Sequence, residues 1–263
     1  MQKVLNHLGY YRPNLPSSVN QSLLIKQAAG FFSGAQEEMQ QHYQTYRTFH
    51  KNKGYEVTLG ESKTLCFEEA FLLYLSVMRL RPAQIVEIGS QYGKSARRLV
   101  DIVQLLGLET RVTCFDLIDE LQFISANEVE LILQDVTHNF STAVLEKLAP
   151  AIIFLDARPY ALLKNVTTHF LEWSLSHPAI LAIHDCSQGL FNPNMKIPKT
   201  DQSHISSKTG VWERHVLSEV FMTPNNRLDD LTTPSHRLKI FNTPHGLALI
   251  APLDILQKAG SLQ

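Results

Sequence analysis

The stretch that decides the fold reads Q-I-V-E-I-G-S-Q-Y-G-K-S-A-R-R-L, residues 84–99. An apolar strand runs into a glycine-containing turn, and the turn leads into a helix. Gly89 can take a backbone conformation that other residues rarely adopt, and Gly93 lets a ligand approach the backbone closely. The free N–H groups at the start of the helix offer hydrogen-bond donors. The stretch therefore predicts a ligand site at the C-terminal end of a buried strand.

Further short apolar runs follow, most of them separated by helical stretches, at residues 111–115, 130–133, 151–155, 179–183, 238–241 and 247–251. Strands that alternate with helices form right-handed βαβ units and a parallel sheet. The last two runs are joined only by N-T-P-H-G, which is too short for a parallel crossover. We therefore expect a doubly wound α/β fold whose sheet ends in an antiparallel hairpin.

Residues 1–60 differ in composition from residues 61–263 and predict an N-terminal helical extension of the main domain. Between Asn20 and about His50 the apolar residues recur every three or four positions, as in an amphipathic helix. Gly30 and Gly34 predict a break in it. The extension packs on the main domain, or it covers a cofactor or joins two copies as a homo-oligomer.

Residues 187–210 are rich in Pro, Asn, Ser and Lys. Their length and composition predict a long loop that acts as a lid over the acceptor site.

Charge and cysteine content narrow the class of protein. The chain has 263 residues and a formal net charge of −1, so nucleic acid and anionic membranes are disfavoured partners. The three cysteines, Cys66, Cys114 and Cys186, are widely spaced, which favours core packing over a disulfide framework. The first residues lack a signal-peptide pattern, and no run reaches the ~20 apolar residues of a membrane span. We expect a cytoplasmic protein.

Two nucleotide-binding motifs compete for the glycine turn. The G-K-S at 93–95 fits a P-loop, but Ile88 stands where that motif needs its first glycine, and Glu87 would repel a triphosphate. The dinucleotide motif G-x-G-x-x-G does not match the spacing of Gly89 and Gly93. Both alternatives remain open at this point but fit poorly.

S-Adenosylmethionine fits the same residues better. This cofactor carries a sulfonium and an ammonium cation and no phosphate, so an acid such as Glu87 at the strand end suits it. Asp116 ends the next strand, V-T-C-F-D. A carboxylate at that place can accept both ribose hydroxyls, as the acidic residue of dinucleotide folds does. The two acids therefore favour S-adenosylmethionine over a nucleoside phosphate.

The first motif, E-I-G-S-Q-Y-G-K-S-A, resembles that of class I S-adenosylmethionine-dependent methyltransferases. It is most similar to the catechol O-methyltransferase-like group and to O-methyltransferases of antibiotic and sugar biosynthesis. The resemblance runs over about residues 60–252. It continues through F-D at 115–116, F-L-D-A at 154–157, H-D-C-S at 184–187, G-V-W-E-R at 210–214 and the ending R-L-K-I-F-N…G-L-A-L-I.

This resemblance implies a seven-stranded sheet in the order 3-2-1-4-5-7-6 with strand 7 antiparallel. It also implies the cofactor-binding residues. The methionine end of the cofactor would be lined by Glu87, Gly89, Ser90, Gly93 and Ser95. Asp116 would hold the ribose, and Asp135 falls where the adenine amino group is usually met, although a solvated loop acid is an equal alternative there.

Acids also follow the fourth and fifth strands. Asp156 ends one of them, and His184 and Asp185 end its neighbour, so their side chains meet at the ligand-binding crevice. Asp156 and Asp185 can hold a divalent cation such as Mg²⁺ through oxygen. In the resembling O-methyltransferases such a cation binds the acceptor hydroxyls and lowers their pKa. His184 joins them as a ligand only if the chain turns at the strand end. The alternative is that His184 and Asp185 bind no metal and only form hydrogen bonds at the start of the loop that follows the strand.

The chain departs from the resembling family at the position of the catalytic base. Many proteins of the resembling family carry a His or Lys about three residues after the strand-4 acid, where this chain has D-A-R-P-Y with Arg158 and Pro159. Arginine does not act as a base at physiological pH. His184, His215 and Lys164 remain as candidate bases, and we place Asp156 and His184 in the catalytic site.

The sequence thus predicts S-adenosylmethionine-dependent O-methylation of a small-molecule hydroxyl. The alternative is a non-catalytic cofactor-binding protein of the same fold, and a P-loop nucleotidase is a more distant one.

Overall fold

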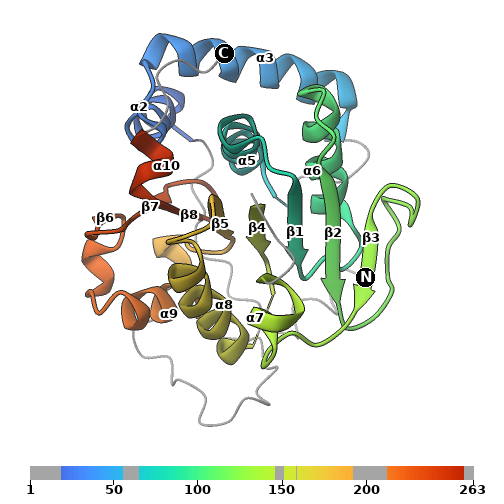
Figure 1. Ribbon diagram of the computed structural model, residues 1–263. Coiled ribbons are helices and arrows are strands. Elements are labelled where there is room, and N and C mark those ends of the chain that lie inside the picture. The colour runs from blue at the N-terminus through green and yellow to red at the C-terminus, as the bar shows by residue number, and fades with distance from the viewer. Residues whose placement is uncertain (1–18, 56–64, 146–150, 158, 192–211, 258–263) are drawn as a thin grey trace, which may run out of the picture.

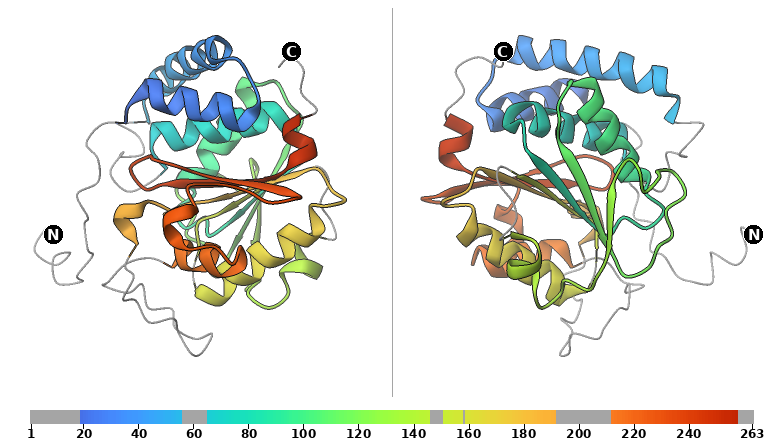
Figure 2. Two further views of the ribbon diagram at one scale, coloured as in Figure 1. Left: turned by 90° about the vertical axis from the view of Figure 1, so that its left-hand side faces the viewer. Right: turned by 45° about the vertical axis from the view of Figure 1, so that its right-hand side comes forward.

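The computed structural model describes residues 19–55, 65–145, 151–157, 159–191 and 212–257. In these ranges an eight-stranded sheet lies between two layers of helices, and two N-terminal helices cover one layer (Figure 1, Figure 2). The helices are α2 (Gln21–Phe32), α3 (Gln36–Lys53), α5 (Phe67–Leu80), α6 (Lys94–Leu105), α7 (Phe140–Ala143), α8 (Tyr160–Trp173), α9 (Glu213–Val220) and α10 (Leu253–Gln257). The strands are β1 (Gln84–Ile88), β2 (Arg111–Asp116), β3 (Glu130–Leu133), β4 (Ala151–Leu155), β5 (Ala179–Ile183), β6 (Asp230–Thr232), β7 (His236–Phe241) and β8 (Leu247–Pro252).

The strand order is β3-β2-β1-β4-β5-β8-β7-β6. Strands β1 to β5 pair in parallel, and β8 runs antiparallel to both β5 and β7. The predicted order 3-2-1-4-5-7-6 is therefore confirmed from β3 to β7, with β8 as the predicted strand 7 and β7 as strand 6. The hairpin predicted from N-T-P-H-G joins β7 to β8.

A short eighth strand, β6, was not predicted and extends the edge of the sheet beyond β7. The sequence does not reveal it, because a three-residue strand is too short to show a period. Asp230 is paired with Lys239 in the register of the two strands, and the Lys239 ammonium lies 3.0 Å from the Asp230 carboxylate. Arg237 on β7 also contacts Asp230, at 3.3 Å. These cross-strand ion pairs add to the antiparallel pairing of β6 with β7 and to the packing of Leu231 against the core.

The N-terminal helices α2 and α3 are separated at Ser33–Ala35, so the predicted break is confirmed, and Ser33 takes the left-handed conformation there. Both helices contribute buried side chains to the cluster that also contains one face of the sheet. The Phe31 ring packs edge-on against Phe241 of β7 at 5.9 Å. The predicted division of the chain at residue 60 lies in 56–64, outside the described residues.

The predicted loop at residues 187–210 is described only at its beginning. Residues 192–211, most of the predicted 187–210 loop, lie outside the described residues, and so does the predicted lid; its described beginning contains a short 3-10 helix at Gln188–Leu190. Among the helices in the described ranges, none has the length and apolar character needed to cross a bilayer.

The β7–β8 turn holds the segment that follows β5. The Cys186 N–H donates to the Gly246 carbonyl oxygen at 2.8 Å, and the Ser187 N–H donates to the His245 carbonyl oxygen at 2.7 Å. Gly246 has a φ of +82°, and a Cβ added there would lie 2.1 Å from the Ser187 nitrogen. Only glycine allows this approach, which fixes the backbone next to Asp185.

Gly246→Ala is expected to destabilise the protein by about 1–3 kcal/mol for the positive φ, with the steric overlap added to that. Gly30→Ala is the matched control, because nothing lies within 4 Å of a Cβ added at that helical position. There alanine should stabilise α2, by up to ~1 kcal/mol. Urea unfolding of the two variants measures the difference, and equal stabilities would contradict the close approach at Gly246.

Candidate active site

The first half of the site lies at the C-terminal end of β1, on the lower side of the sheet in Figure 1. Glu87 shares the sheet face of Ile85, which packs in the cluster with α5 and α6, and its side chain is fully buried. The Cys114 thiol donates to Glu87 Oε2 at 3.5 Å, whereas Oε1 has no hydrogen-bond partner. Burial raises the pKa of Glu87 to about 7, and the nearby Asp156 charge adds to the shift. An unsatisfied buried carboxylate oxygen suits a cationic group brought by a ligand.

The glycine turn follows the predicted course. Gly89 has a φ of +92°, its N–H donates to the Phe115 carbonyl oxygen at 2.9 Å, and an added Cβ would lie 2.4 Å from the Asp156 carbonyl oxygen. Gly93 has a φ of +77°, but the space of its missing Cβ is filled by Ile124 and Leu121, at 2.7 and 2.9 Å. Packing of the β2–β3 loop by itself therefore requires glycine at position 93, and the predicted approach of a ligand there stays a prediction.

Asp116 joins the end of β2 to this turn. Its Oδ2 accepts the Gln91 N–H at 2.7 Å, and its Oδ1 accepts the Leu117 N–H at the same distance. The side chain is half-buried, so the carboxylate is held in one orientation beside the glycine turn. Both oxygens keep acceptor capacity, because a carboxylate oxygen can accept more than one hydrogen bond.

Three apolar side chains beside Asp116 escaped the sequence analysis. Each is more than half exposed at the C-terminal ends of β2 and β3: Leu117, Ile118 and Leu133. Exposed large apolar side chains gathered at a strand edge are typical of the walls of a ligand site. The available signal was the L-I pair directly after Asp116, the residue at which the strand was predicted to end.

The remaining predicted cofactor residues lie around the same edge. Ser90 is buried in the turn. Ser95, half-buried in the first turn of α6, opposes the rise in the pKa of Glu87. Asp135 is exposed after β3, and its Oδ1 accepts the Thr137 N–H at 2.8 Å. The loop-acid alternative for Asp135 therefore has a structural basis, and the carboxylate also faces solvent.

The second half of the site is formed by the ends of β4 and β5. Ligand atoms of Asp156, His184 and Asp185 all lie within 4.8 Å of one another. His184 Nδ1 is 3.4 Å from the Asp156 carboxylate and 3.5 Å from that of Asp185. Asp185 has a φ of +61°, so the chain turns directly after β5. This turn places both adjacent side chains on the same side, which a continued strand would prevent.

A buried glutamate that the sequence analysis missed lies behind His184. Glu69, in the first turn of α5, is fully buried, and its Oε2 lies 3.1 Å from His184 Nε2. Burial alone would raise the pKa of Glu69, but His184 and His245 outweigh it and hold that pKa well below its usual range. Burial alone would lower the pKa of His184, yet Asp156, Asp185 and Glu69 hold that pKa well above its usual value. The surrounding carboxylates therefore favour the positively charged form of the His184 ring.

The other base candidates lie apart from this cluster. Lys164 on α8 pairs with Glu219 at 2.6 Å, and the His215 ring on α9 packs 4.6 Å from the Phe191 ring. Arg158 lies outside the described residues. Of the candidate bases, His184 contacts the predicted acids.

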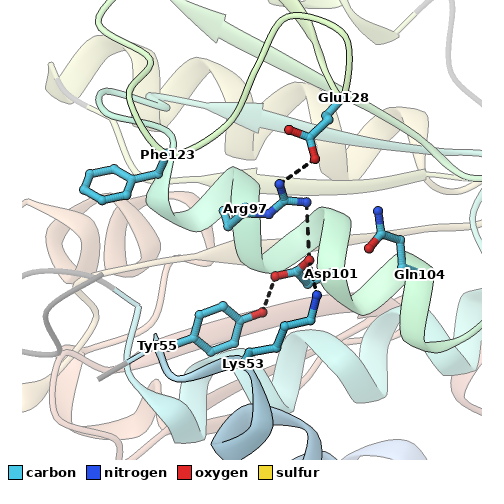
Figure 3. Close-up of a pocket in the computed structure, with 7 residues that line it drawn as sticks. All are labelled: Lys53, Tyr55, Arg97, Asp101, Gln104, Phe123 and Glu128. Atoms are coloured by element: carbon cyan, nitrogen blue, oxygen red, sulfur yellow. Dashed lines mark hydrogen bonds and ion pairs between the residues drawn. The ribbon is translucent and has the colours of Figure 1, made fainter. Parts of the chain in front are cut away.

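A separate pocket of about 420 Å³ lies between the end of α3, α6 and the β2–β3 loop (Figure 3). Its charged side chains are mutually paired: Asp101 accepts from Lys53 at 2.9 Å and from the Tyr55 hydroxyl, and Arg97 bridges Asp101 to Glu128. None of the predicted site residues lines it. We therefore place the candidate active site at the strand ends and not in this pocket.

No family model and no curated protein sequence matches the chain significantly. Several solved structures do. The O-methyltransferase TomG from Streptomyces achromogenes, in complex with SAM, is 14% identical over 95% of this chain and 96% of that one, with a TM-score of 0.45. A putative caffeoyl-CoA O-methyltransferase from Staphylococcus aureus is 14% identical over 78% of this chain and 91% of that one, with a TM-score of 0.48.

An SAH complex of CmcI is 21% identical over 48% of this chain, with a TM-score of 0.39. The matched parts span only 50%, 51% and 63% of three CmcI structures. At these identities and scores the comparisons record a likeness, and the assignment of function rests on the residues above. The chain resembles solved SAM-dependent O-methyltransferases.

Proposed function

We propose that the protein binds S-adenosylmethionine at the C-terminal edge of β1, β2 and β3 and transfers its methyl group to an oxygen of a small molecule. The observation that carries the proposal is the fully buried Glu87 carboxylate, with Oε1 unpartnered, directly before the glycine turn. That group would repel a phosphate and attract the cationic methionine end of the cofactor. Asp116 receives the ribose, and the exposed Leu117, Ile118 and Leu133 form an apolar wall for the adenine.

The acceptor binds beside Asp156, Asp185 and His184. Methyl transfer is an in-line displacement: the acceptor oxygen bonds the methyl carbon as the carbon–sulfur bond breaks, so alignment supplies much of the rate. The Asp156 side chain is 39% exposed and is the member of the cluster that an acceptor can reach most easily. We assign Asp156 to holding the acceptor hydroxyl and accepting its proton. His184 supports Asp156 in this position, because its two ring nitrogens already face Glu69 on one side and the two aspartates on the other.

The chemistry of the cluster fits a divalent cation. Two carboxylates and one imidazole nitrogen within 4.8 Å provide three ligands. Asp156, Asp185 and His184 would hold the ion. A cation bound there lowers the pKa of a coordinated acceptor hydroxyl. The chain's own contribution is to hold these three groups at the acceptor site.

One observation favours a second, non-catalytic function. The His184 ring nitrogen lies within 3.5 Å of both carboxylates, so the cluster also makes sense as a structural ion network. A protein of this kind would bind the cofactor and transfer nothing. Methyl transfer to a panel of catechols and sugars distinguishes the two.

Calorimetric titration with S-adenosylhomocysteine tests the proposed cofactor directly, and Asp116→Ala is expected to weaken binding. Loss of a charge-assisted contact costs ~1.5–3 kcal/mol, or about tenfold to a hundredfold in affinity. Asp119→Ala is the control, since Asp119 is an exposed acid in the same loop that accepts one local N–H. Preferential binding of ATP with Mg²⁺ would refute the assignment and support the P-loop alternative.

Affinity for S-adenosylhomocysteine should also rise with pH. Because the pKa of Glu87 is about 7 in the free protein, the carboxyl is mostly neutral at pH 6 and must lose its proton to pair with the ligand's ammonium group. Linkage predicts a roughly tenfold gain between pH 6 and pH 8, with nearly one proton released per ligand at the lower pH. Glu87→Gln should remove both effects. Calorimetry in buffers of different ionisation enthalpy counts the protons, and a pH-independent wild type would contradict this role.

Chelation is expected to stop methyl transfer and leave cofactor affinity nearly intact, because Glu87 and Asp116 lie on other strands. Asp185→Asn should keep the fold, since asparagine tolerates the left-handed conformation found there, and should lower turnover by removing one ligand charge. Asp119→Asn serves as the control. Transfer that survives both the chelator and Asp185→Asn would remove the metal from the reaction.

A further inference from the structure

Glu69 ties three separate parts of the fold together. Its Oε1 accepts the Thr243 hydroxyl at 2.8 Å and the His245 N–H at 3.0 Å, both from the β7–β8 turn. Its Oε2 accepts the Cys66 N–H at the start of α5 at 3.0 Å and lies 3.1 Å from His184 Nε2 after β5. His245 Nδ1 also lies 3.4 Å from Oε2. A carboxylate removed from water is costly unless its oxygens are satisfied, and here Oε1 has two partners and Oε2 has three.

These contacts hold the carboxylate in one place. The capping box with Cys66 fixes the Glu69 side chain to the N-terminus of its own helix, where the helix dipole also favours a negative charge. The two donors from the β7–β8 turn fix it from the opposite side. Only one of the four partners, His184, is a side chain of the candidate active site.

We propose that Glu69 is a positioning residue that accepts the Nε2–H of His184 and thereby presents Nδ1 of that ring to Asp156 and Asp185 as a nitrogen ligand for a divalent cation. The inference rests on the metal-assisted form of the proposed function. Histidine ligands in metal sites commonly donate their second ring N–H to a carboxylate, which fixes the tautomer and the ring plane. Glu69 and His184 have the distance and burial for that arrangement, and Nδ1 faces the two acids.

A nitrogen ligand changes which cation the site prefers. Two carboxylates alone suit Mg²⁺, whereas an added imidazole favours Mn²⁺ or Fe²⁺. When the cation binds Nδ1, the proton on that nitrogen leaves to solvent, while the Nε2 proton stays on the hydrogen bond to Glu69. Glu69 thus acts on metal selectivity without touching the metal.

A neighbouring cluster of Cys66, Glu69 and His245 also has ligand atoms within 4.8 Å of one another. Both Glu69 oxygens there already have two or more hydrogen-bond partners each, which leaves little acceptor capacity for a metal ion. The same carboxylate therefore orients His184 and is not itself a ligand. Cys66→Ser separates the two assignments, because it alters this cluster and leaves the His184 contact in place.

The test measures Mn²⁺ and Mg²⁺ affinity of the full chain by calorimetry, in the wild type, in Glu69→Gln and in Glu68→Gln. Glu68 is the matched control: the same side chain one position earlier, half-buried on the same helix. Glu69→Gln is expected to weaken Mn²⁺ binding about tenfold to a hundredfold, to weaken Mg²⁺ binding less, and to leave S-adenosylhomocysteine affinity unchanged. Glu68→Gln and Cys66→Ser should match the wild type. A wild-type Mn²⁺ affinity in Glu69→Gln, or a loss in Cys66→Ser, would overturn the inference and leave the proposed function standing.

A second readout needs neither metal nor activity. In wild-type protein labelled with ¹⁵N-histidine, His184 should give a downfield, slowly exchanging Nε2 proton, identified by its absence from His184→Gln. Glu69→Asp, whose shorter side chain keeps the charge but draws away from His184, should lose that signal, which covers the case in which Glu69→Gln does not fold. If no cation binds the wild type, the metal-assisted function fails, and this signal still decides whether Glu69 orients the ring. Absence of the signal from the wild type would overturn the inference.

Discussion

Accumulation of negative charge at one edge of the sheet is the constraint on which the rest of the site depends. Parallel pairing of β1, β2, β4 and β5 ends these strands at the same edge, where acids follow them: Glu87, Asp116, Asp156 and Asp185. The protein accommodates these acids in three different ways. Backbone N–H groups satisfy Asp116, the His184 ring lies between Asp156 and Asp185, and Glu87 takes a raised pKa in its buried position. An edge arranged in this way favours cationic ligands and disfavours phosphates.

Helix α5 belongs to the site because it carries Glu69, whose carboxylate contacts His184. Glu69 reaches from that helix to the end of β5 and to the β7–β8 turn, so three elements distant in sequence meet at one carboxylate. The turn approaches closely because Gly246 has no side chain, and its carbonyl oxygen holds the Cys186 N–H. The position of His184 is therefore determined from two sides.

Periodicity and turn chemistry predicted most of the fold. The apolar runs marked the buried strands, and the short N-T-P-H-G connection required the hairpin. Strand β6 was missed because three residues, with Leu231 as the single apolar one, are too few to show a period. The acids at the strand ends could be predicted because each of them comes at the end of an apolar run that marks a strand. Glu69 could not, because in C-F-E-E-A it reads as one of two acids in a first helical turn, and only tertiary packing distinguishes it from Glu68. Gly93 was predicted to let a ligand approach the backbone, whereas the contacts of Ile124 and Leu121 at this position depend on tertiary packing that the sequence does not show.

The central claim is that the strand edge holds a cationic nucleoside and a divalent cation side by side. A crystal structure grown with S-adenosylhomocysteine and Mn²⁺, with anomalous diffraction collected at the manganese edge, tests it most directly. The account predicts ribose density against Asp116, the ligand's ammonium group beside Glu87, and an anomalous peak among Asp156, His184 and Asp185. A ligand bound elsewhere, or an anomalous peak at Cys66 and His245, would contradict it.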